Sequence, residues 1–124
     1  MKIEYIEKKL GLHIPERHKQ AMLDSTDPIH KICDFLLPDR TDKMRDIVEQ
    51  NEILHSISGF PTPWPPRLVV FASNGCGDYF AYDIQAKDYS IIYVDPDSTV
   101  EQNLKSDDKF TFASFEDWYA YKIA

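Results

Sequence analysis

Hydrophobic residues recur at helical spacing at the start of the chain. Ile3, Ile6 and Leu10 are separated mainly by glutamates and lysines, a pattern that predicts an amphipathic helix ending at Gly11. A second short helix is predicted from Pro15, because proline suits the first position of a helix. The first part of the chain is therefore expected to be helical.

The pattern is less regular in the residues that follow. The sequence Thr-Asp-Pro at 26–28 ends the second helix. Residues 32–37 suit either a short strand or a loop, and Pro38 ends that segment in both cases. The local pattern alone leaves these two alternatives open.

A longer helix is predicted next. Thr41 or Asp42 would cap its first turn, and the Ser-Gly pair at 58–59 would end it. Its apolar stripe comprises Met44, Ile47, Val48, Leu54 and Ile57. The spacing of this stripe slips near Asn51, where a polar residue interrupts it.

The pattern then becomes typical of strands. An apolar run at 68–72, a turn containing Gly75 and Gly77, and an aromatic run at 79–84 predict a β-hairpin at the centre of the fold. The two glycines supply backbone angles that residues with a Cβ atom adopt only at a cost. Residues 90–94 are predicted to form a third strand.

The end of the chain combines a turn, a short strand and a helix. A turn is predicted at 95–98 (Asp-Pro-Asp-Ser), a brief helical turn at 100–104 and a strand at 110–112. Ser114 is expected to cap a closing helix, with Asp117 at the third position of a capping box. Residues that can share one face of this helix are Phe115, Trp118, Tyr119 and Ile123.

This order of elements predicts an α+β fold. We expect a single antiparallel sheet, with N-terminal helices and one C-terminal helix packed mainly on one side of it. At 124 residues, the chain is expected to form one domain over 1–124. The proline-dense run at 60–66 is interpreted as a rigid connector in which Trp64 covers apolar surface, and a ligand for an SH3 or WW domain is the alternative.

Acidic residues outnumber basic ones. The formal net charge is −7 and the pI is about 4.9. Such a surface repels phosphates, so nucleic acid is not an expected direct partner, whereas a basic protein would be attracted. The same charge also favours solubility, and the sequence does not decide between these uses. The acidic residues around the third helix suit an anionic face or an ordinary solvated one: Asp39, Asp42, Asp46, Glu49 and Glu52.

The cysteines and the N-terminus indicate a cytoplasmic protein. Cys33 and Cys76 belong to no Cys-x-x-Cys pattern, which fits reduced thiols, although one bridge between them stays open. Cys76 has no basic neighbour in the sequence that would activate its thiol. The first ten residues are too charged for a signal peptide, and no apolar run is long enough for a membrane span. The oligomeric state is not indicated.

The residues that usually carry chemistry lack the spacing they would need. The histidines show no metal-site pattern and are expected at the surface or half-buried: His13, His18, His30 and His55. Residues 73–78 are followed by a strand, unlike a phosphate-binding loop. Asp95 and Asp97 begin like a calcium loop, but Val100 and Ser106 stand where glycine and glutamate are needed. No catalytic residue, metal or cofactor is therefore predicted.

Several stretches together point to a known family. They are Leu-Val-Val-Phe-Ala-Ser-Asn-Gly-Cys-Gly-Asp-Tyr-Phe-Ala-Tyr-Asp, then Ile-Ile-Tyr-Val-Asp-Pro-Asp, the closing Phe-Ala-Ser-Phe-Glu-Asp-Trp-Tyr and the early Ile-Glu-x-x-Leu-Gly-Leu-x-Ile-Pro. In these the chain resembles the SUKH superfamily, which includes fungal Smi/Knr cell-wall regulators and many bacterial immunity proteins. The resemblance covers most of the chain and is loosest over 24–66.

The resemblance implies a fold and a role. The implied structural signature is Gly75, Gly77 and Asp78 in the hairpin turn and Trp118 in the last helix. The implied fold is α+β with one antiparallel sheet and no catalytic residues. Bacterial members neutralise toxins, often nucleases, by direct binding. The expected function is therefore that of an immunity protein whose cognate toxin has a basic surface.

The residues that would contact such a toxin are predicted from interface composition. Interface anchors are often tyrosine or tryptophan, and here they would lie inside an acidic rim. The candidates are Trp64, Tyr79, Tyr93, Asp95 and Asp97. An adaptor or scaffold of the Smi/Knr type, with no toxin partner, is the alternative function. A hydrolase or metal enzyme built on the aspartates is disfavoured, because the sequence lacks a nucleophile–base pair or a set of ligands.

Overall fold

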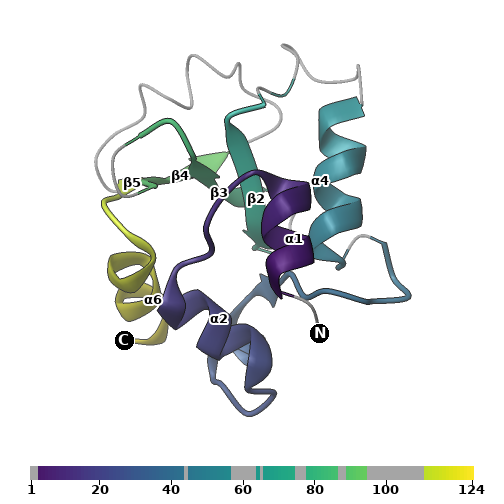
Figure 1. Ribbon diagram of the computed structural model, residues 1–124. Helices are drawn as coiled ribbons and strands as arrows, with labels where there is room; N and C mark the ends of the chain where they lie inside the picture. The colour runs from purple at the N-terminus through teal and green to yellow at the C-terminus, as the bar shows by residue number, and fades with distance from the viewer. Residues whose placement is uncertain are drawn as a thin grey trace.

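The computed structural model shows a sheet with helices packed around it (Figure 1). It describes residues 3–43, 45–56, 64, 66–74, 78–86, 89–94 and 111–124. Several predicted features lie outside these residues: Met44, the helix end at 58–59, most of the proline-dense run, Gly75, Cys76, Gly77, the turn at 95–98 and the helical turn at 100–104.

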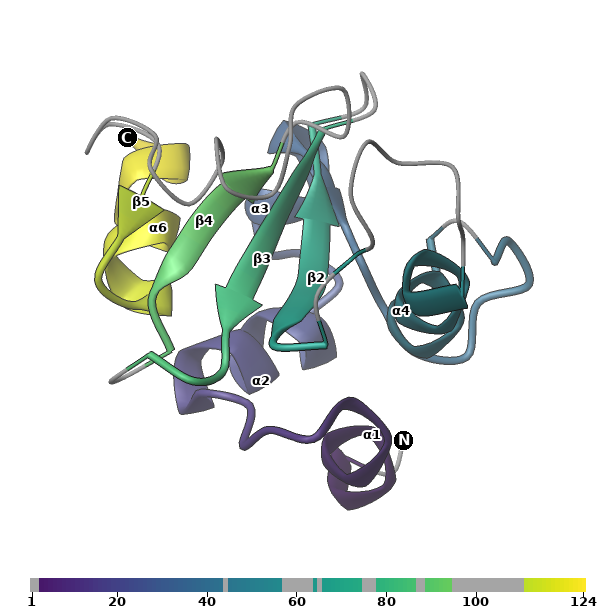
Figure 2. The same cartoon turned by 90° about the horizontal axis from the view of Figure 1, so that it is seen from above.

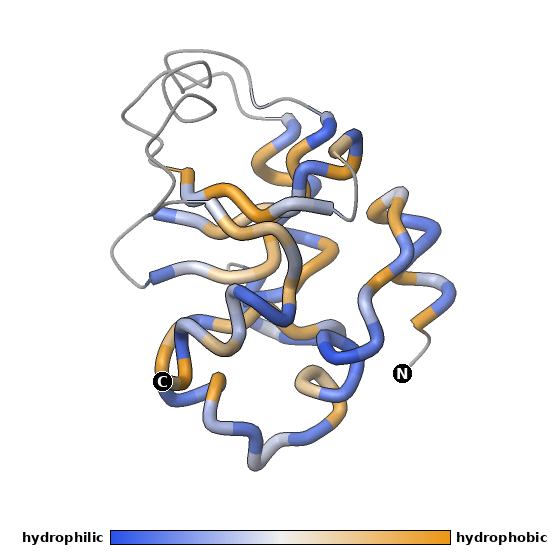
Figure 3. The backbone as a smooth tube through the Cα atoms, turned by 90° about the vertical axis from the view of Figure 1, so that its left-hand side faces the viewer, coloured by the Kyte–Doolittle hydropathy of each residue, from blue (hydrophilic) through white to orange (hydrophobic). Residues whose placement is uncertain are grey.

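The two N-terminal helices are confirmed. α1 (Ile3–Leu10) ends at Gly11, whose φ of 75° lies in the left-handed region that favours glycine. Figure 3 shows the amphipathic pattern of α1 as alternating orange and blue segments. α2 (Glu16–Leu23) begins one residue later than predicted, because Pro15 has the extended backbone of a cap (φ −55°, ψ 145°).

The next segment contains a helix that the sequence pattern did not predict. α3 (Ile29–Ile32) is a single turn that follows Pro28, and the carboxylate of Asp27 accepts a hydrogen bond from the Ile29 N–H at 3.0 Å. Of the two alternatives for 32–37, the strand is correct in part, since β1 (Asp34–Phe35) pairs with the sheet.

The longer helix begins later than predicted. α4 (Ile47–Ser56) is capped by Asp46, whose Oδ1 accepts the N–H groups of Val48 (3.0 Å) and Glu49 (2.9 Å). Thr41 and Asp42 lie in the preceding irregular segment, so the prediction that one of them caps this helix is wrong. The other oxygen of Asp46 accepts the Arg40 N–H at 2.9 Å, which stabilises that segment as a loop.

Within the described residues, five antiparallel strands form one sheet in chain order. The predicted hairpin is β2 (Leu68–Ser73) and β3 (Tyr79–Asp83), followed by β4 (Ile91–Val94) and β5 (Thr111–Phe112). All four neighbouring pairs are antiparallel. A register shift between Val70 and Ala72 leaves Phe71 as an extra residue in β2, a β-bulge.

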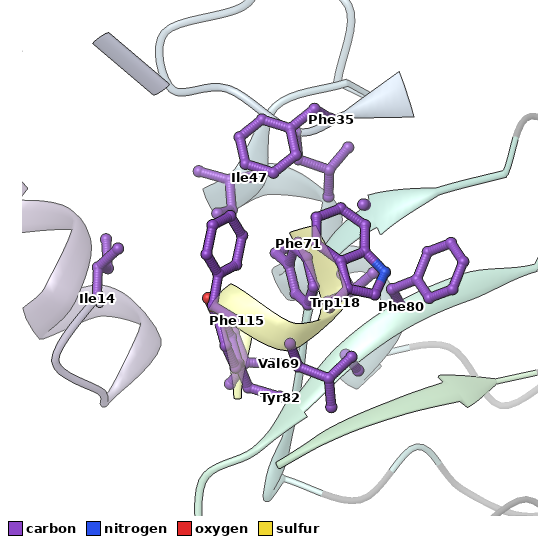
Figure 4. Packing of buried hydrophobic residues seen from close by; sticks show 14 of the residues in the cluster. Ile14, Phe35, Ile47, Val69, Phe71, Phe80, Tyr82, Phe115 and Trp118 are labelled. Atoms are coloured by element: carbon purple, nitrogen blue, oxygen red, sulfur yellow. The ribbon is translucent and has the colours of Figure 1, made fainter. Parts of the chain in front are cut away.

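One face of the sheet is covered by α2 and the last helix, α6 (Phe115–Ile123). Trp118 is 0% exposed, and its ring centroid lies 4.8 Å from that of Phe71 and 5.4 Å from that of Phe80. Figure 4 shows these rings converging with Phe115 from different elements. The α+β prediction, with helices mainly on one side, is confirmed.

The cap of α6 is also confirmed, since Ser114 Oγ accepts the Asp117 N–H at 3.3 Å. Its predicted apolar face needs one correction. Phe115, Trp118 and Tyr119 are buried, but Ile123 is 40% exposed. The buried stripe therefore ends before the last turn of the helix. None of the helices in the described parts of the chain has the length and apolarity needed to cross a membrane.

β1 pairs only with Ala72 and Ser73 of β2, and α4 lies beside the remaining part of that strand (Figure 2). Asn51 is 3% exposed and pairs with the β2 backbone in both directions. Its Nδ2 donates to Val70 O and its Oδ1 accepts the Val70 N–H, both at 2.8 Å. A helix side chain thus supplies the hydrogen bonds that a further strand would make.

Candidate interaction site

A polar network joins the end of the β2–β3 hairpin to β4. Asp78 donates its N–H to Asn74 Oδ1 (3.3 Å), and Asn74 donates its N–H to Asp78 O (3.1 Å). The Tyr93 hydroxyl donates to the Asp78 carboxylate and accepts from Asn74 Nδ2 at 3.1 Å. Asp78, a residue of the expected signature, therefore links Asn74, just after the end of β2, to Tyr93 of β4.

The other residues of the expected signature are Trp118, Gly75 and Gly77. Trp118 is fully buried in the aromatic core, so its indole offers no surface to a partner. Gly75 and Gly77 lie outside the described residues. Asp78 and Trp118 make contacts within the fold, and their place in a family signature stays a prediction.

Of the predicted contact residues, Trp64 and Tyr79 lie against each other. Trp64 is 6% exposed, donates its indole N–H to Leu68 O at 2.8 Å, and lies edge-on to Tyr79 with ring centroids 6.1 Å apart. Tyr79 is half-buried, and its hydroxyl accepts from Gln50 Nε2 at 3.2 Å. Burial raises the pKa of Tyr79. Trp64 is therefore a packing residue, with little surface left for an anchor role.

Tyr93 lies on the other face of the sheet. In the register of β3 and β4, Tyr79 pairs with Val94, whereas Tyr93 pairs with Phe80. Because successive residues of a strand point to opposite faces, Tyr79 and Tyr93 cannot belong to the same flat surface. Asp95 and Asp97 lie outside the described residues, so a contact role for them stays a prediction.

The expectation of surface or half-buried histidines is wrong for His18. This residue is 1% exposed in α2, and its ring stacks on Phe115 with centroids 4.8 Å apart. Its Nδ1 lies 2.7 Å from the Tyr82 hydroxyl. Burial lowers the pKa of His18 from 6.5 to about 3, so the imidazole is neutral in the folded protein at neutral pH.

His18 makes stability dependent on pH. The unfolded chain binds a proton at this residue below about pH 6.5, whereas the folded chain does so only near pH 3. Stability conferred by the neutral ring is thus complete above pH 6.5 and decreases as the pH falls toward 3. Between pH 7.5 and pH 5 we expect a loss of about 2 kcal/mol in the free energy of unfolding.

Urea unfolding at both pH values checks this loss. The matched control is His18→Phe combined with Tyr82→Phe, which removes the titrating ring without leaving a hydroxyl unpaired. This variant should lose about 2 kcal/mol less than the natural chain over the same interval. An equal loss in both proteins would show that other groups cause the pH dependence.

A second buried polar group joins α2, α3 and α6. Asp27 is 5% exposed, pairs with Arg17 Nη2 at 3.0 Å and accepts the Tyr119 hydroxyl at 2.8 Å. Burial acts to raise the pKa of Asp27, but the hydrogen bonds from Ile29 N–H, Tyr119 and Arg17 outweigh it, so the pKa is lowered. The charge is stabilised by these partners and serves to hold the helices together.

Three further candidates for chemistry among the described residues, His30, His55 and Cys33, are engaged or inactive. His30 Nε2 lies 2.9 Å from Ala21 O, and His55 Nε2 lies 3.1 Å from Leu68 O. Burial raises the pKa of the Cys33 thiol to about 11, which keeps it protonated. Within the described ranges, no group of three histidine, cysteine, aspartate or glutamate side chains could hold a metal ion.

Comparison with known proteins adds one finding. The model of the SMI1 / KNR4 family (SUKH-1) matches residues 2–121, nearly the whole chain. No curated protein and no solved structure matches the sequence.

Proposed function

Because the chain belongs to the SMI1 / KNR4 family (SUKH-1), we propose that it is a non-catalytic immunity protein that neutralises a cognate bacterial toxin by direct binding. The family includes toxin-immunity proteins as well as Smi1/Knr4 members. The family match over residues 2–121 is the observation that carries the proposal.

The described side chains support binding rather than catalysis. The most buried histidine, His18, contacts aromatic rings and the Tyr82 hydroxyl and has no path to a substrate. Cys33 has a protonated thiol, and Asp27 is held by three partners. His18 and Asp27 therefore stabilise the fold, and the Cys33 thiol is not activated.

The charge of the chain supports a basic partner. At −7, the protein attracts positively charged surfaces over distances of about a Debye length, which speeds association. An enzyme that cleaves nucleic acid needs such a surface to hold phosphates, so a nuclease toxin fits this charge. We place the complex in the cytoplasm, where such a toxin acts.

Co-expression tests the proposal. The toxin encoded next to the gene for this chain is induced with and without the protein, and an inactive toxin and an unrelated toxin serve as controls. We expect survival with the cognate toxin only. Equal killing with and without the protein would contradict the immunity function.

An adaptor function is the second candidate, because the family name covers Smi1/Knr4 regulators as well. An adaptor has no toxin gene beside it and binds a partner whose activity it does not abolish. The position of the gene and the survival assay therefore separate the two functions.

A further inference from the structure

A groove of about 640 Å³ lies between α1, the loop after β1 and the start of α4. Figure 1 shows this loop running from the sheet to α4 on the side where α1 lies. The described lining residues are Tyr5, Ile6, Pro38, Asp39, Arg40, Asp46, Val48 and Glu49. The groove is open to solvent and is larger than one side chain needs.

The charged groups of the groove are mostly carboxylates. Asp46 has its oxygens occupied by the N–H groups of Arg40, Val48 and Glu49. Asp39 and the Glu49 side chain form no ion pair with any described residue, and Arg40 is the only basic side chain among the described lining residues. Two carboxylates are therefore available to an external cation.

An aromatic ring and an apolar wall accompany these carboxylates. Tyr5 is 54% exposed, although tyrosine is usually more buried. Its ring already attracts a cation of the chain itself, since Lys9 Nζ lies 5.7 Å from the ring centroid. Among the apolar lining residues, Val48 is half-buried and offers surface along which the stem of a long side chain can lie, whereas Ile6 and Pro38 are buried.

We infer that this groove binds an arginine-bearing segment of the partner protein, with guanidinium groups at Asp39 and Glu49 and against the Tyr5 ring. Arginine pairs with carboxylates, stacks on aromatic faces and lays its stem on apolar surface, so it uses all three features of the groove. The inference rests on the proposed function, because it gives the basic partner a docking position on the acidic chain.

Binding is tested with a capped peptide, Gly-Arg-Gly-Arg-Gly, titrated into isotope-labelled protein and followed by amide NMR shifts. We expect saturable shifts concentrated at Tyr5, Arg40, Val48 and Glu49, weakening as salt is raised. The same peptide with citrulline, which has the shape of arginine without its charge, should not bind. Shifts spread over other acidic surfaces, or equal binding of citrulline, would overturn the inference.

Substitutions at the groove give the second test. Asp39→Asn preserves the backbone, because asparagine tolerates the φ of 58° found there, and Glu49→Gln preserves the side-chain shape. Together they should weaken peptide binding about tenfold. Glu116→Gln, at an exposed carboxylate of α6, is the matched control and should change binding less than about twofold. Equal effects of the groove and control variants would exclude the groove.

Binding of an acidic segment, in place of a basic one, is a separate outcome of the peptide titration. An acidic segment would use Arg40 and Arg45, which line the adjoining groove, and binding of Gly-Glu-Gly-Glu-Gly in place of the arginine peptide would replace the inference. Survival assays separate the two proposals. Full protection by the Asp39→Asn, Glu49→Gln chain rejects the groove but keeps the immunity function. Failure of the natural chain to protect rejects the immunity function. In that case, the peptide titration still tests whether the groove binds arginine.

Discussion

Trp118→Ala is expected to lower the free energy of unfolding by about 3–5 kcal/mol. The indole is 0% exposed and contacts the rings of Phe71, Phe80 and Phe115. Its removal leaves a cavity among residues of β2, β3 and α6, and the rigid sheet cannot close around it. Because domains of this size have only about 5–15 kcal/mol of stability, the loss would be a large fraction of the total.

Urea unfolding followed by circular dichroism measures the effect. Trp118→Phe keeps an aromatic ring, and the indole N–H that it removes has no hydrogen-bond partner among the described residues. This variant should therefore lose clearly less stability than Trp118→Ala. Tyr121→Ala, at a 65% exposed site on the same helix, is the control and should change stability by less than about 0.5 kcal/mol. A Trp118→Ala effect as small as that of Tyr121→Ala would show that the packing is not as described.

Asn51→Ala is expected to have the second large effect, lowering the free energy of unfolding by about 2–5 kcal/mol. The substitution leaves both the N–H and the carbonyl of Val70 without the partner that Asn51 provides. Ile47 O also loses the bond from Asn51 Nδ2, which is 2.8 Å long. Buried backbone groups without partners carry their full desolvation cost, because water does not reach them in this part of the fold.

A pair of variants shows whether hydrogen bonding is the cause. Asn51→Asp keeps the acceptor but places a carboxylate oxygen against the carbonyls of Ile47 and Val70. Its loss of stability should therefore match or exceed that of Asn51→Ala. Glu52→Ala, at an exposed position of the same helix, should be nearly neutral. A stable Asn51→Asp protein would mean that Asn51 does not satisfy the β2 edge.

The strands and the last cap were predictable because their signals are local. The apolar run at 68–72 and the aromatic run at 79–84 each bury both faces of a central strand, and neighbouring strands follow each other in the sequence. Ser114 needs only the third residue after it, Asp117, to form its cap. Such patterns need no knowledge of distant contacts.

Asn51 and His18 depend on contacts that are distant in the sequence. The slip in the apolar stripe near Asn51 was visible, but its meaning requires the edge of β2, 19 residues further on. His18 lies between Ile14 and Met22 at intervals of four residues, a spacing that places it on the buried side of α2. Its partner Tyr82 is 64 residues away, so only the fold identifies it.

The contact role of the candidate residues stays a prediction, but two of them, Tyr79 and Tyr93, do not share one surface. Both are aromatic, as interface anchors often are, yet the antiparallel register places them on opposite faces of the sheet. The groove that contains Tyr5, Asp39 and Glu49 combines residues from three separate elements. Composition predicts an acidic and aromatic interface, whereas the proposed groove depends on how α1 and α4 meet.

The measurement that tests the central claim most directly is a titration of toxin activity with the purified protein. A protein that acts only by covering its partner must be consumed as the complex forms. We therefore predict that toxin activity falls in proportion to added protein and reaches its minimum near one equivalent, with the toxin recovered intact after denaturation. Complete loss of activity at a small fraction of an equivalent, or a chemically altered toxin, would contradict this account.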